Sequence, residues 1–348
     1  MSKALVVKTG RAAGRADARR TEIAAVAVDA LSDVGFSGQT LAAGVEREVG
    51  TAVGGAVSIW RRFVDGGGPA APWPADGAFS AGVIRLPGGW DAFRMTLHAV
   101  CARLPAGAPL WIYGGAEEGI TSVDSHLDGL ADGLETVAIK KRTRVLRLAR
   151  TAAPANGDQA DWRTYADIIA PGAPSPLQLA FYPGCFAACR LDEGTRLLLE
   201  AVPSYRDGGR VLDFACGSGV VAAALRARTP DIRLALLDAD ALALDAAREN
   251  VPGAEIILAD GAAALPGLAS GERFELIISN PPIHQGRQED FSVLAALLEH
   301  GPKLLKLKGS LVFVVQRTAG AGRLIAAHGR KAALLKETTA FQVWRIGV

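Results

Sequence analysis

Three consecutive residues in the last quarter of the chain, Asn280, Pro281 and Pro282, have types suited to holding an amino group for reaction. They directly follow the apolar stretch 274–279, whose pattern predicts a strand. Prolines cannot extend a strand, so they predict a rigid, exposed turn. That turn would offer two acceptors, the amide oxygen of Asn280 and the carbonyl oxygen of Pro281. Two placed acceptors could hold an NH2 group whose lone pair is delocalised and aim it at an electrophilic carbon.

The residues after this turn extend the candidate catalytic segment. His284 and Gln285 could line a pocket for the target group, although His284 could equally be a turn residue with a satisfied ring. The chain shows no recognisable Ser-His-Asp or Cys-His arrangement, and a direct displacement requires no covalent intermediate. The candidate catalytic residues are Asn280, Pro281, Pro282, Ile283 and His284.

A second group of residues suggests a nucleoside cofactor. Small residues between Asp213 and Gly219 follow one predicted strand, and small side chains allow a ligand to approach the backbone closely. Asp238 ends the next strand, where dinucleotide-type sites place an acid for ribose hydroxyls. Asp260 follows the third strand, near the expected place of an adenine amino group. The candidate cofactor-binding residues are Asp213, Ala215, Cys216, Gly217, Gly219, Asp238, Asp260 and Asn280.

The spacing within this turn argues against two other nucleotide-binding loops. Position 222, where a Gly-x-Gly-x-x-Gly loop would have its third glycine, is alanine. No Lys-Ser or Lys-Thr pair follows, so the turn is not a triphosphate-binding loop. The turn therefore favours an adenosyl sulfonium over a nicotinamide dinucleotide.

Regular alternation of strands and helices predicts an α/β fold with a doubly wound, mostly parallel, Rossmann-like sheet. In such a sheet the carboxyl ends of the strands meet at one edge, where ligands bind. The predicted strands are 211–214, 234–238, 255–258, 274–279 and 310–315, and the predicted helices are 220–228, 241–250 and 291–305.

The first half of the chain shows a shorter alternation of the same kind. The apolar run 110–115 ends in two glycines like the run 211–217, which predicts a degenerate copy of the fold without a cofactor site. Two unrelated α/β pieces remain the alternative. Prolines and glycines over 151–180 place the boundary, giving domain 1–170, a candidate for substrate binding, and domain 171–348, which we expect to be catalytic. The elements expected in the first half are strands at 83–86, 110–113 and 145–148 and helices at 21–31, 90–104 and 120–134.

Length and composition restrict the class of protein. A chain of 348 residues with 49% hydrophobic and 21% charged residues fits two folded domains. The four cysteines form no disulfide framework, and Cys185 and Cys189 have no second Cys or His pair nearby, so we expect free thiols and no metal. No apolar run reaches about 18 residues, and the basic N-terminus lacks a signal-peptide core. These features predict a cytoplasmic protein without a membrane partner.

Basic residues could provide contacts to nucleic acid in two places, although the net charge of +2 does not itself indicate such a partner. Their contacts to phosphates would be largely independent of sequence. A solvated basic face is the equally simple interpretation. The two groups are Lys140, Lys141, Arg142, Arg144, Arg147 and Arg150, and Lys303, Lys306 and Lys308.

Taken together, these motifs resemble the bacterial ribosomal RNA guanine-N2 methyltransferases of the small subunit methyltransferase C type. Members end the fourth strand with Asn-Pro-Pro-Phe-His, which here is 280–284. The resemblance covers 81–348, through 85–87, 110–114, 119–122, 183–186, 191–199 and 339–345. It implies S-adenosylmethionine as cofactor, the exocyclic N2 of a guanine as acceptor and ribosomal RNA or a ribosomal subunit as partner. We expect a monomer.

Three departures from the family pattern bear on the substrate. Ala215 replaces the first glycine of the turn, and Gln316-Arg317 with the next three residues replace an Asn and a Leu-Pro-Tyr. Ile283 replaces an aromatic residue that would stack on the target base, an interaction worth about 1–3 kcal/mol. Two alternatives therefore stay open. One is a methyltransferase for a small molecule or a protein amide nitrogen, and the other is a non-catalytic RNA-binding or assembly factor.

Overall fold

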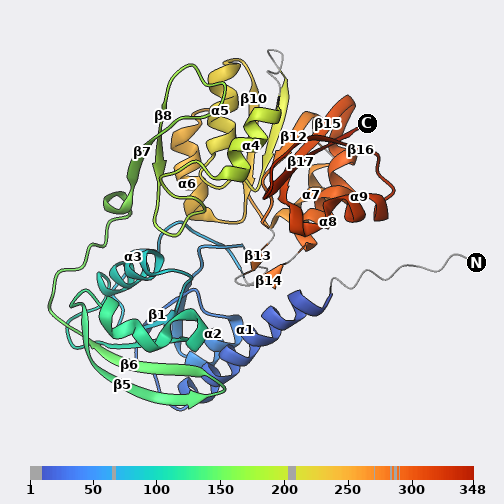
Figure 1. Cartoon of the computed structure of the whole chain (residues 1–348). Coiled ribbons are helices and arrows are strands. Elements are labelled where there is room, and N and C mark those ends of the chain that lie inside the picture. The colour runs from blue at the N-terminus through green and yellow to red at the C-terminus, as the bar shows by residue number, and fades with distance from the viewer. Residues whose placement is uncertain are drawn as a thin grey trace, which may run out of the picture. The chain divides into compact units, whose positions relative to one another are not determined.

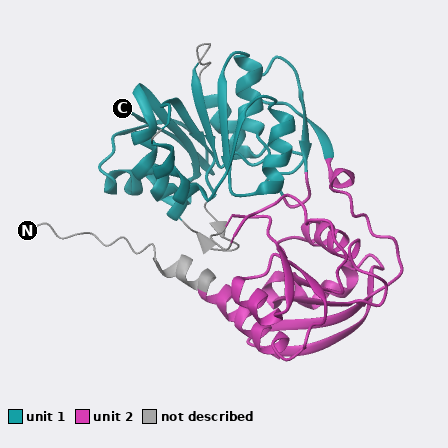
Figure 2. Ribbon diagram, turned by 180° about the vertical axis from the view of Figure 1, so that it is seen from behind, with its two compact units in different colours: residues 1–16, 164–181, 185–348 teal, residues 17–163, 182–184 magenta. Residues whose placement is uncertain are grey.

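The computed structural model describes residues 10–64, 68–202, 209–269, 271–282, 284–285, 288–289 and 291–348, without the side chains of 10–17, 284–285 and 288–289. The chain divides into two compact units (Figure 2). Of the described residues, unit 1 contains 10–16, 164–181 and 185–348, and unit 2 contains 17–163 and 182–184. Within the described part, no helix is long and apolar enough to cross a membrane.

Unit 1 is built on a seven-stranded sheet in the order β11-β10-β9-β12-β15-β17-β16. The first five strands are parallel to one another, β17 is antiparallel to β15, and β16 is antiparallel to β17. The strands are β9 (Arg210–Phe214), β10 (Arg233–Asp238), β11 (Glu255–Leu258), β12 (Phe274–Ser279), β15 (Leu305–Gln316), β16 (Ala332–Glu337) and β17 (Phe341–Gly347). The helices are α4 (Glu193–Ala201), α5 (Val220–Arg228), α6 (Ala241–Asn250), α7 (Gly261–Leu268), α8 (Ser292–His300) and α9 (Ala321–Ala327).

Alternating apolar residues along the strands of unit 1 build two cores, one on each face of the sheet. Leu276 and Ile278 of β12 pack with residues of α4, α5 and α6, whereas Ile277 packs with residues of α7, α8 and α9. Figure 1 labels these helices around the sheet. Helices on both faces of a mostly parallel sheet are the doubly wound arrangement, so the predicted fold class is confirmed.

Unit 2 has a six-stranded sheet in the order β2-β1-β3-β4-β6-β5. Four strands are parallel, and β6 and β5 are antiparallel to their neighbours. The strands are β1 (Gln39–Ala43), β2 (Ala56–Trp60), β3 (Ala81–Arg85), β4 (Pro109–Gly115), β5 (Ala131–Lys140) and β6 (Thr143–Arg150). Helices α1 (Gly10–Leu31) and α2 (Arg47–Val53) pack on one face, and α3 (Trp90–Cys101) packs on the other.

This order repeats the order β10-β9-β12-β15-β17-β16 of unit 1 strand for strand, with the same directions. No strand in the described part of unit 2 takes the place of β11. The expected second copy of the fold is therefore confirmed, but the assigned correspondence was wrong. Strand β4, at 109–115, takes the place of β15, and β1, which the sequence did not predict, takes the place of β9.

Two predicted helices are corrected by the structure. The helix expected at 120–134 is a 3-10 helix, Ile120–His126, followed by β5, because Asp128, Gly129 and Gly133 have positive φ angles that end any helix. The helix expected at 291–305 ends at His300 and continues as a 3-10 turn, Gly301–Leu304, where Pro302 lacks a backbone N–H. The stretch expected as a linker contains the antiparallel pair β7 (Thr164–Ile168) and β8 (Leu177–Phe181).

Candidate active site

The predicted site residues of unit 1 lie along one edge of its sheet. Strands β10, β9 and β12 are adjacent and parallel, and their last paired residues include Leu237 with Phe214 and Phe214 with Ser279. The segments that follow them therefore start side by side. This arrangement brings together the turn after β9, Asp238 at the end of β10 and Asn280 after β12, as the sequence predicted.

The turn after β9 has an unusual backbone. Ala215, Gly217 and Gly219 have φ angles of 58°, 54° and 77°. A Cβ atom on Gly217 would meet nothing within 4 Å, so the backbone at this residue borders open space. A Cβ atom on Gly219 would lie 3.2 Å from the Cβ of Ala247. Gly217 thus leaves room for a ligand, whereas Gly219 lets the turn pack closely on α6.

Asp238 ties this turn to the start of α6. Its Oδ2 accepts a hydrogen bond from the backbone N of Gly217 at 2.7 Å, and its Oδ1 accepts one from the backbone N of Asp240 at 2.9 Å. Burial raises the pKa of Asp238, and these backbone donors oppose that shift. Each carboxylate oxygen can accept a further bond, so Asp238 keeps acceptor capacity for ribose hydroxyls.

Asp213, in β9 just before the turn, joins the end of this strand to α5 through a hydrogen bond. Its side chain is 1% exposed, and its Oδ2 accepts a hydrogen bond from the backbone N of Ala222 at 3.1 Å. The bond fastens the first turn of α5 to the end of β9. Burial raises the pKa of Asp213 to about 8, with a smaller contribution from the charge of Asp238. With so little exposed surface, Asp213 is suited to shaping the turn and not to touching a ligand.

The remaining candidate cofactor residues border the same edge. Asp260 is exposed and begins α7, where its Oδ1 accepts from the backbone N of Ala262 at 3.2 Å. The backbone N of Cys216 donates to the carbonyl oxygen of Leu237 at 3.1 Å, which joins the turn to β10. The Cys216 thiol is buried, and burial raises its pKa far above the usual value, so it stays protonated.

Asn280 is held by residues on a different element. Its Nδ2 donates to Oδ2 of Asp192 at 3.1 Å and to Oγ1 of Thr195 at 3.0 Å. Asp192 is also the N-cap of α4, because the same Oδ2 accepts from the backbone N of Thr195 at 3.1 Å. With both amide hydrogens engaged, Oδ1 of Asn280 remains as an acceptor. Pro281 is buried and Pro282 is exposed.

Two predicted catalytic residues fall wholly or partly outside the described part of the chain, and two residues that contact Asn280 were not among the candidates. Ile283 and the side chain of His284 lie outside the described residues. Asp192 and Thr195 were not among the candidate site residues, although the run Asp192 to Thr195 before three leucines has the pattern of a helix start. That pattern indicates a cap, but nothing in it points to Asn280.

The segment from Cys185 to Asp192 crosses this edge of the sheet. At one end the Cys185 thiol lies 4.0 Å from Oδ2 of Asp240, at the start of α6. At the other end Asp192 contacts Asn280, beyond β12. Because β9 lies between β10 and β12, the two ends of the segment lie on either side of the turn after β9. Among the described residues the four cysteines form no disulfide, and no group of His, Cys, Asp or Glu could hold a metal.

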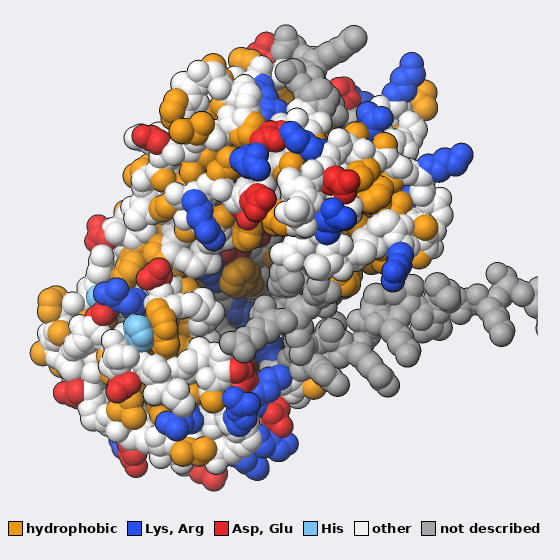
Figure 3. All heavy atoms as spheres, in the orientation of Figure 1, with side chains coloured by type: hydrophobic (Ala, Val, Ile, Leu, Met, Phe, Trp, Pro, Cys, Tyr) orange, Lys and Arg blue, Asp and Glu red, His pale blue; other side chains and the backbone are white. Residues whose placement is uncertain are grey.

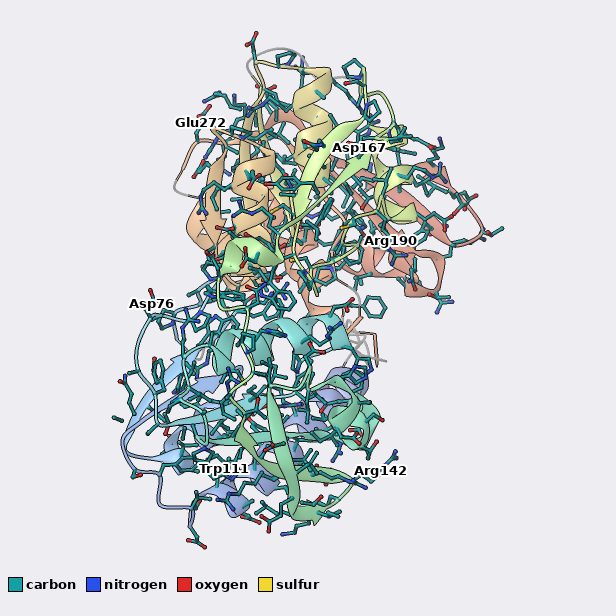
Figure 4. The ribbon with its side chains drawn as sticks, turned by 90° about the vertical axis from the view of Figure 1, so that its left-hand side faces the viewer. Asp76, Trp111, Arg142, Asp167, Arg190 and Glu272 are labelled. Atoms are coloured by element: carbon teal, nitrogen blue, oxygen red, sulfur yellow. The ribbon has the colours of Figure 1, made fainter. Side chains whose placement is uncertain are left out.

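The basic group in unit 2 is less available than its sequence suggested. Arg150 is buried and donates to the backbone carbonyls of Cys101, Leu130, Thr151 and Ala153, so its assignment as a possible RNA contact was wrong. Lys140, Lys141 and Arg147 form ion pairs with Asp29, Glu22 and Glu135. Arg142 is exposed at the tip of the β5–β6 hairpin (Figure 4). Blue basic and red acidic side chains are interspersed on the face drawn in Figure 3.

A separate hollow of about 440 Å³ lies at the opposite edge of the unit 1 sheet, where its strands begin. Its charged lining is internally paired: Arg210 lies 2.6 Å from Glu255, and Arg233 lies 2.7 Å from Glu272, which is labelled in Figure 4. The hollow is therefore remote from the strand ends that carry the candidate site.

Comparisons with known proteins agree with this geometry. The model of the methyltransferase small domain family matches residues 176–345. A ribosomal RNA small subunit methyltransferase C of Stutzerimonas stutzeri strain A1501 is 34% identical over 278 residues, which are 78% of this chain and 80% of that protein. The protein of the same name from Hahella chejuensis is 32% identical over 276 residues, 78% of each chain.

The fold is shared with a solved structure of a 16S rRNA N2 G1207 methyltransferase from T. thermophilus, in complex with AdoMet and guanosine. The TM-score is 0.80 at 19% identity, and the match covers 94% of this chain and 91% of the other. The strand order, the edge that gathers the Asn-Pro-Pro turn beside the glycine turn, and identities above 30% over most of both chains lead to one conclusion. The chain belongs to the ribosomal RNA small subunit methyltransferase C family and is a methyltransferase.

Proposed function

We propose that this chain transfers the methyl group of S-adenosylmethionine to the exocyclic N2 of a guanine in ribosomal RNA. The observation that carries the proposal is the Asn280 amide, whose oxygen is left as an acceptor beside the small-residue turn after β9. The RNA and the guanine come from the names of the relatives and from the T. thermophilus complex.

The edge of the sheet has the features that an adenosyl sulfonium requires. The open space at Gly217 allows close approach of a ligand to the turn. Asp238 has spare acceptor capacity for ribose hydroxyls, and exposed Asp260 could accept from an adenine amino group. When bound, S-adenosylmethionine supplies an electrophilic methyl carbon. The residues of the chain then serve to place the cofactor and the amino group, and none of them needs to form a covalent bond.

The contribution of Asn280 is to hold and polarise the target amino group. Its Oδ1, together with the carbonyl oxygen of Pro281, would accept hydrogen bonds from the two N2 hydrogens. These bonds orient the nitrogen lone pair and stabilise the positive charge that develops on nitrogen as the new bond forms. One N2 proton is then lost to solvent, which restores a neutral amine. A guanine within a helix must first be flipped out of the stack to reach this position.

The rest of the proposal concerns the setting. We infer that the chain acts as a monomer in the cytoplasm, on naked RNA or on the small ribosomal subunit. We also propose that unit 2 contributes to substrate binding, and that the exposed Arg142 is one of its contacts to RNA phosphates.

A labelling experiment tests the proposed substrate. The protein is incubated with methyl-labelled S-adenosylmethionine and, separately, small subunits, naked ribosomal RNA, or an extract of metabolites and proteins. We expect label in RNA, recovered as N2-methylguanosine after digestion, and its loss with Asn280→Ala. Label only in small molecules or protein would support the amide or small-molecule alternative. Cofactor binding without any transfer would support the non-catalytic assembly factor.

A further inference from the structure

We propose that Asp192 and Thr195 are positioning residues, which fix the Asn280 amide so that its oxygen, and not its NH2 group, faces the target amino group. The inference rests on the proposed function and deepens it. An amide has two ends of nearly equal size, and only one end can accept from an N–H donor. A reversed amide would oppose donor to donor and could not hold the substrate.

The carboxylate of Asp192 selects one of the two amide orientations. An ionised carboxylate accepts hydrogen bonds and cannot donate them. Oδ2 of Asp192 lies 3.1 Å from Nδ2 of Asn280, so reversing the amide would bring two oxygens together without a hydrogen between them. Thr195 adds a second acceptor, since its Oγ1 lies 3.0 Å from the same Nδ2. Both amide hydrogens are thus directed away from the side where Oδ1 remains.

The selecting group is itself held firmly. Oδ2 of Asp192 accepts from the backbone N of Thr195, at the start of α4, and Thr195 is buried. The next turn of α4 is anchored in the core through three buried leucines, Leu197, Leu198 and Leu199. The position of the Asn280 amide is therefore tied to a packed helix and not only to its own turn.

The packing around Asp192 provides independent support. A Cβ atom on Gly194 would lie 3.0 Å from Oδ2 of Asp192 and 3.1 Å from Cε1 of Phe341. Gly194 is buried, so a larger residue would displace the carboxylate that contacts Asn280. A simple helix cap requires only the bond to the backbone N of Thr195. The bond to Asn280, across 88 residues of sequence, adds nothing to the cap itself.

The first test separates positioning from stability at Thr195. Thr195→Val keeps the shape and the backbone N but removes the hydroxyl acceptor, and Thr195→Ser restores it. We expect Thr195→Val to lower kcat about tenfold with little change in the KM values for cofactor and RNA, and Thr195→Ser to recover most of the loss. Equal kcat values for Thr195→Val and wild type, or equal losses in both variants, would overturn the role of the hydroxyl.

In the second test, one substitution at Asp192 is expected to change kcat in opposite directions, depending on the residue at position 280. Asn280→Asp places two carboxylates in contact. Adding Asp192→Asn removes one of them, so the double variant should have a kcat at least tenfold higher than Asn280→Asp alone. In the wild-type background Asp192→Asn should lower kcat, because it removes the charge that selects the amide orientation. The cap is controlled with Asp158→Ala, which removes a comparable bond to the backbone N of Ala160 in unit 2. If the effects of the two substitutions at 192 and 280 simply multiply, the proposed contact has no functional role.

A third measurement does not depend on activity. The side-chain amide protons of Asn280 can be assigned by NMR, because their signals are absent in Asn280→Ala. In the wild-type protein they should exchange slowly with solvent. In Thr195→Val the exchange rate should rise by at least fivefold. Unchanged exchange in Thr195→Val would overturn the inference even if the enzyme is active. Absence of methyl transfer by the wild-type protein would instead contradict the proposed function, and the exchange data would still test the contact.

Discussion

The ends of β12 in unit 1 and β3 in unit 2 occupy the same place in two sheets of the same order, yet they carry opposite chemistry. Asn280 follows Ser279, the last residue of β12 that pairs with β9, and Arg85 follows Ile84, the last residue of β3 that pairs with β1. The side-chain oxygen of Asn280 remains as an acceptor, whereas Arg85 lies 2.6 Å from a carboxylate oxygen of Glu118. The strand order alone therefore does not make a site.

Unit 2 satisfies its polar groups at this edge internally. Arg85 also lies 3.4 Å from Glu46, and the hydroxyl of Tyr113 donates to Oε2 of Glu46 at 2.6 Å. Burial and the charge of Glu46 raise the pKa of Tyr113 well above its usual value, so it stays a donor. Unit 2 thus has paired charges at the position where unit 1 has an oriented amide. The two strand ends thus differ in their residues and contacts, and not in the order of the strands around them.

The largest expected effect comes from removing the side-chain amide of Asn280, which has no counterpart at the end of β3 in unit 2. Asn280→Ala should lower kcat for RNA methylation by about 10²–10³, as loss of one group that stabilises developing charge does in other enzymes. Its melting temperature, measured by calorimetry, should stay close to wild type. Retention of more than a tenth of the activity would remove the functional contrast between the two strand ends.

The second prediction disrupts the paired charges of unit 2. Arg85→Ala leaves the carboxylate of Glu46, a side chain only 8% exposed, without this partner. Breaking a buried pair in this way costs about 3 kcal/mol of unfolding free energy. Urea denaturation should show the loss, and Arg94→Ala, which breaks an exposed pair with Asp128, should cost less than about 1 kcal/mol. Equal losses of unfolding free energy in Arg85→Ala and Arg94→Ala would mean that the ion pairs of Arg85 stabilise the fold no more than an exposed pair does.

The third prediction concerns Asp213, a buried acid in β9 whose counterpart in β1, by register, is Ala42. The pKa of Asp213 is raised to about 8 in the folded chain, against about 3.9 when unfolded, so the folded state binds the extra proton between these values. Its contribution to stability is therefore present below pH 4 and lost as pH rises through 8. Between pH 6 and 8 we expect a decline of about 1 kcal/mol per pH unit.

The matched variant for this effect is Asp213→Asn, whose amide oxygen can still accept from the backbone N of Ala222. Denaturant titrations of both proteins at pH 6, 7 and 8 should give a shallower decline for Asp213→Asn. Asp238, whose pKa is also raised, contributes a slope of the same sign in both proteins, so the difference between the two slopes reports Asp213 together with its coupling to Asp238. Parallel pH profiles would show that Asp213 is ionised throughout this range.

The smallest expected effects lie in the first residue of each turn. Gly44 follows β1 with φ 68°, and Ala215 follows β9 with φ 58°, so unit 2 has the glycine that unit 1 lacks. A residue with a Cβ in this left-handed region lowers the stability of the folded state by roughly 1–2 kcal/mol relative to glycine. Glycine offsets part of this advantage, because it gives the unfolded chain more conformational entropy. Ala215→Gly should therefore stabilise the chain by about 0.5 kcal/mol, and Gly44→Ala should destabilise it by about 1 kcal/mol.

Thermal unfolding measures both substitutions. A Cβ on Gly44 would lie 3.8 Å from the Cβ of Arg85, an ordinary contact, so the cost should come from the backbone alone. Shifts in the same direction for both variants would show that the two turns are not equivalent.

Much of unit 1 could be predicted because its signals are local. The bounds of α5, α6, β11 and β12 agree with the predicted ranges 220–228, 241–250, 255–258 and 274–279. Their ends are marked by short apolar runs, acids and small-residue turns that are legible in neighbouring residues. The first 80 residues lack such signals, and β1 and β2, with their mixed polar and small residues, were not predicted.

By itself, the sequence determined the fold class, the family and the order of the Asn-Pro-Pro turn and the glycine turn, because each depends on residues adjacent in the chain. Only the tertiary structure decided which strands of the two units correspond, that Arg150 is buried, and that Asp192 and Thr195 hold the Asn280 amide. These properties depend on groups separated by tens of residues, and a hydrogen bond across 88 residues forms only once α4 and β12 are packed in the same unit.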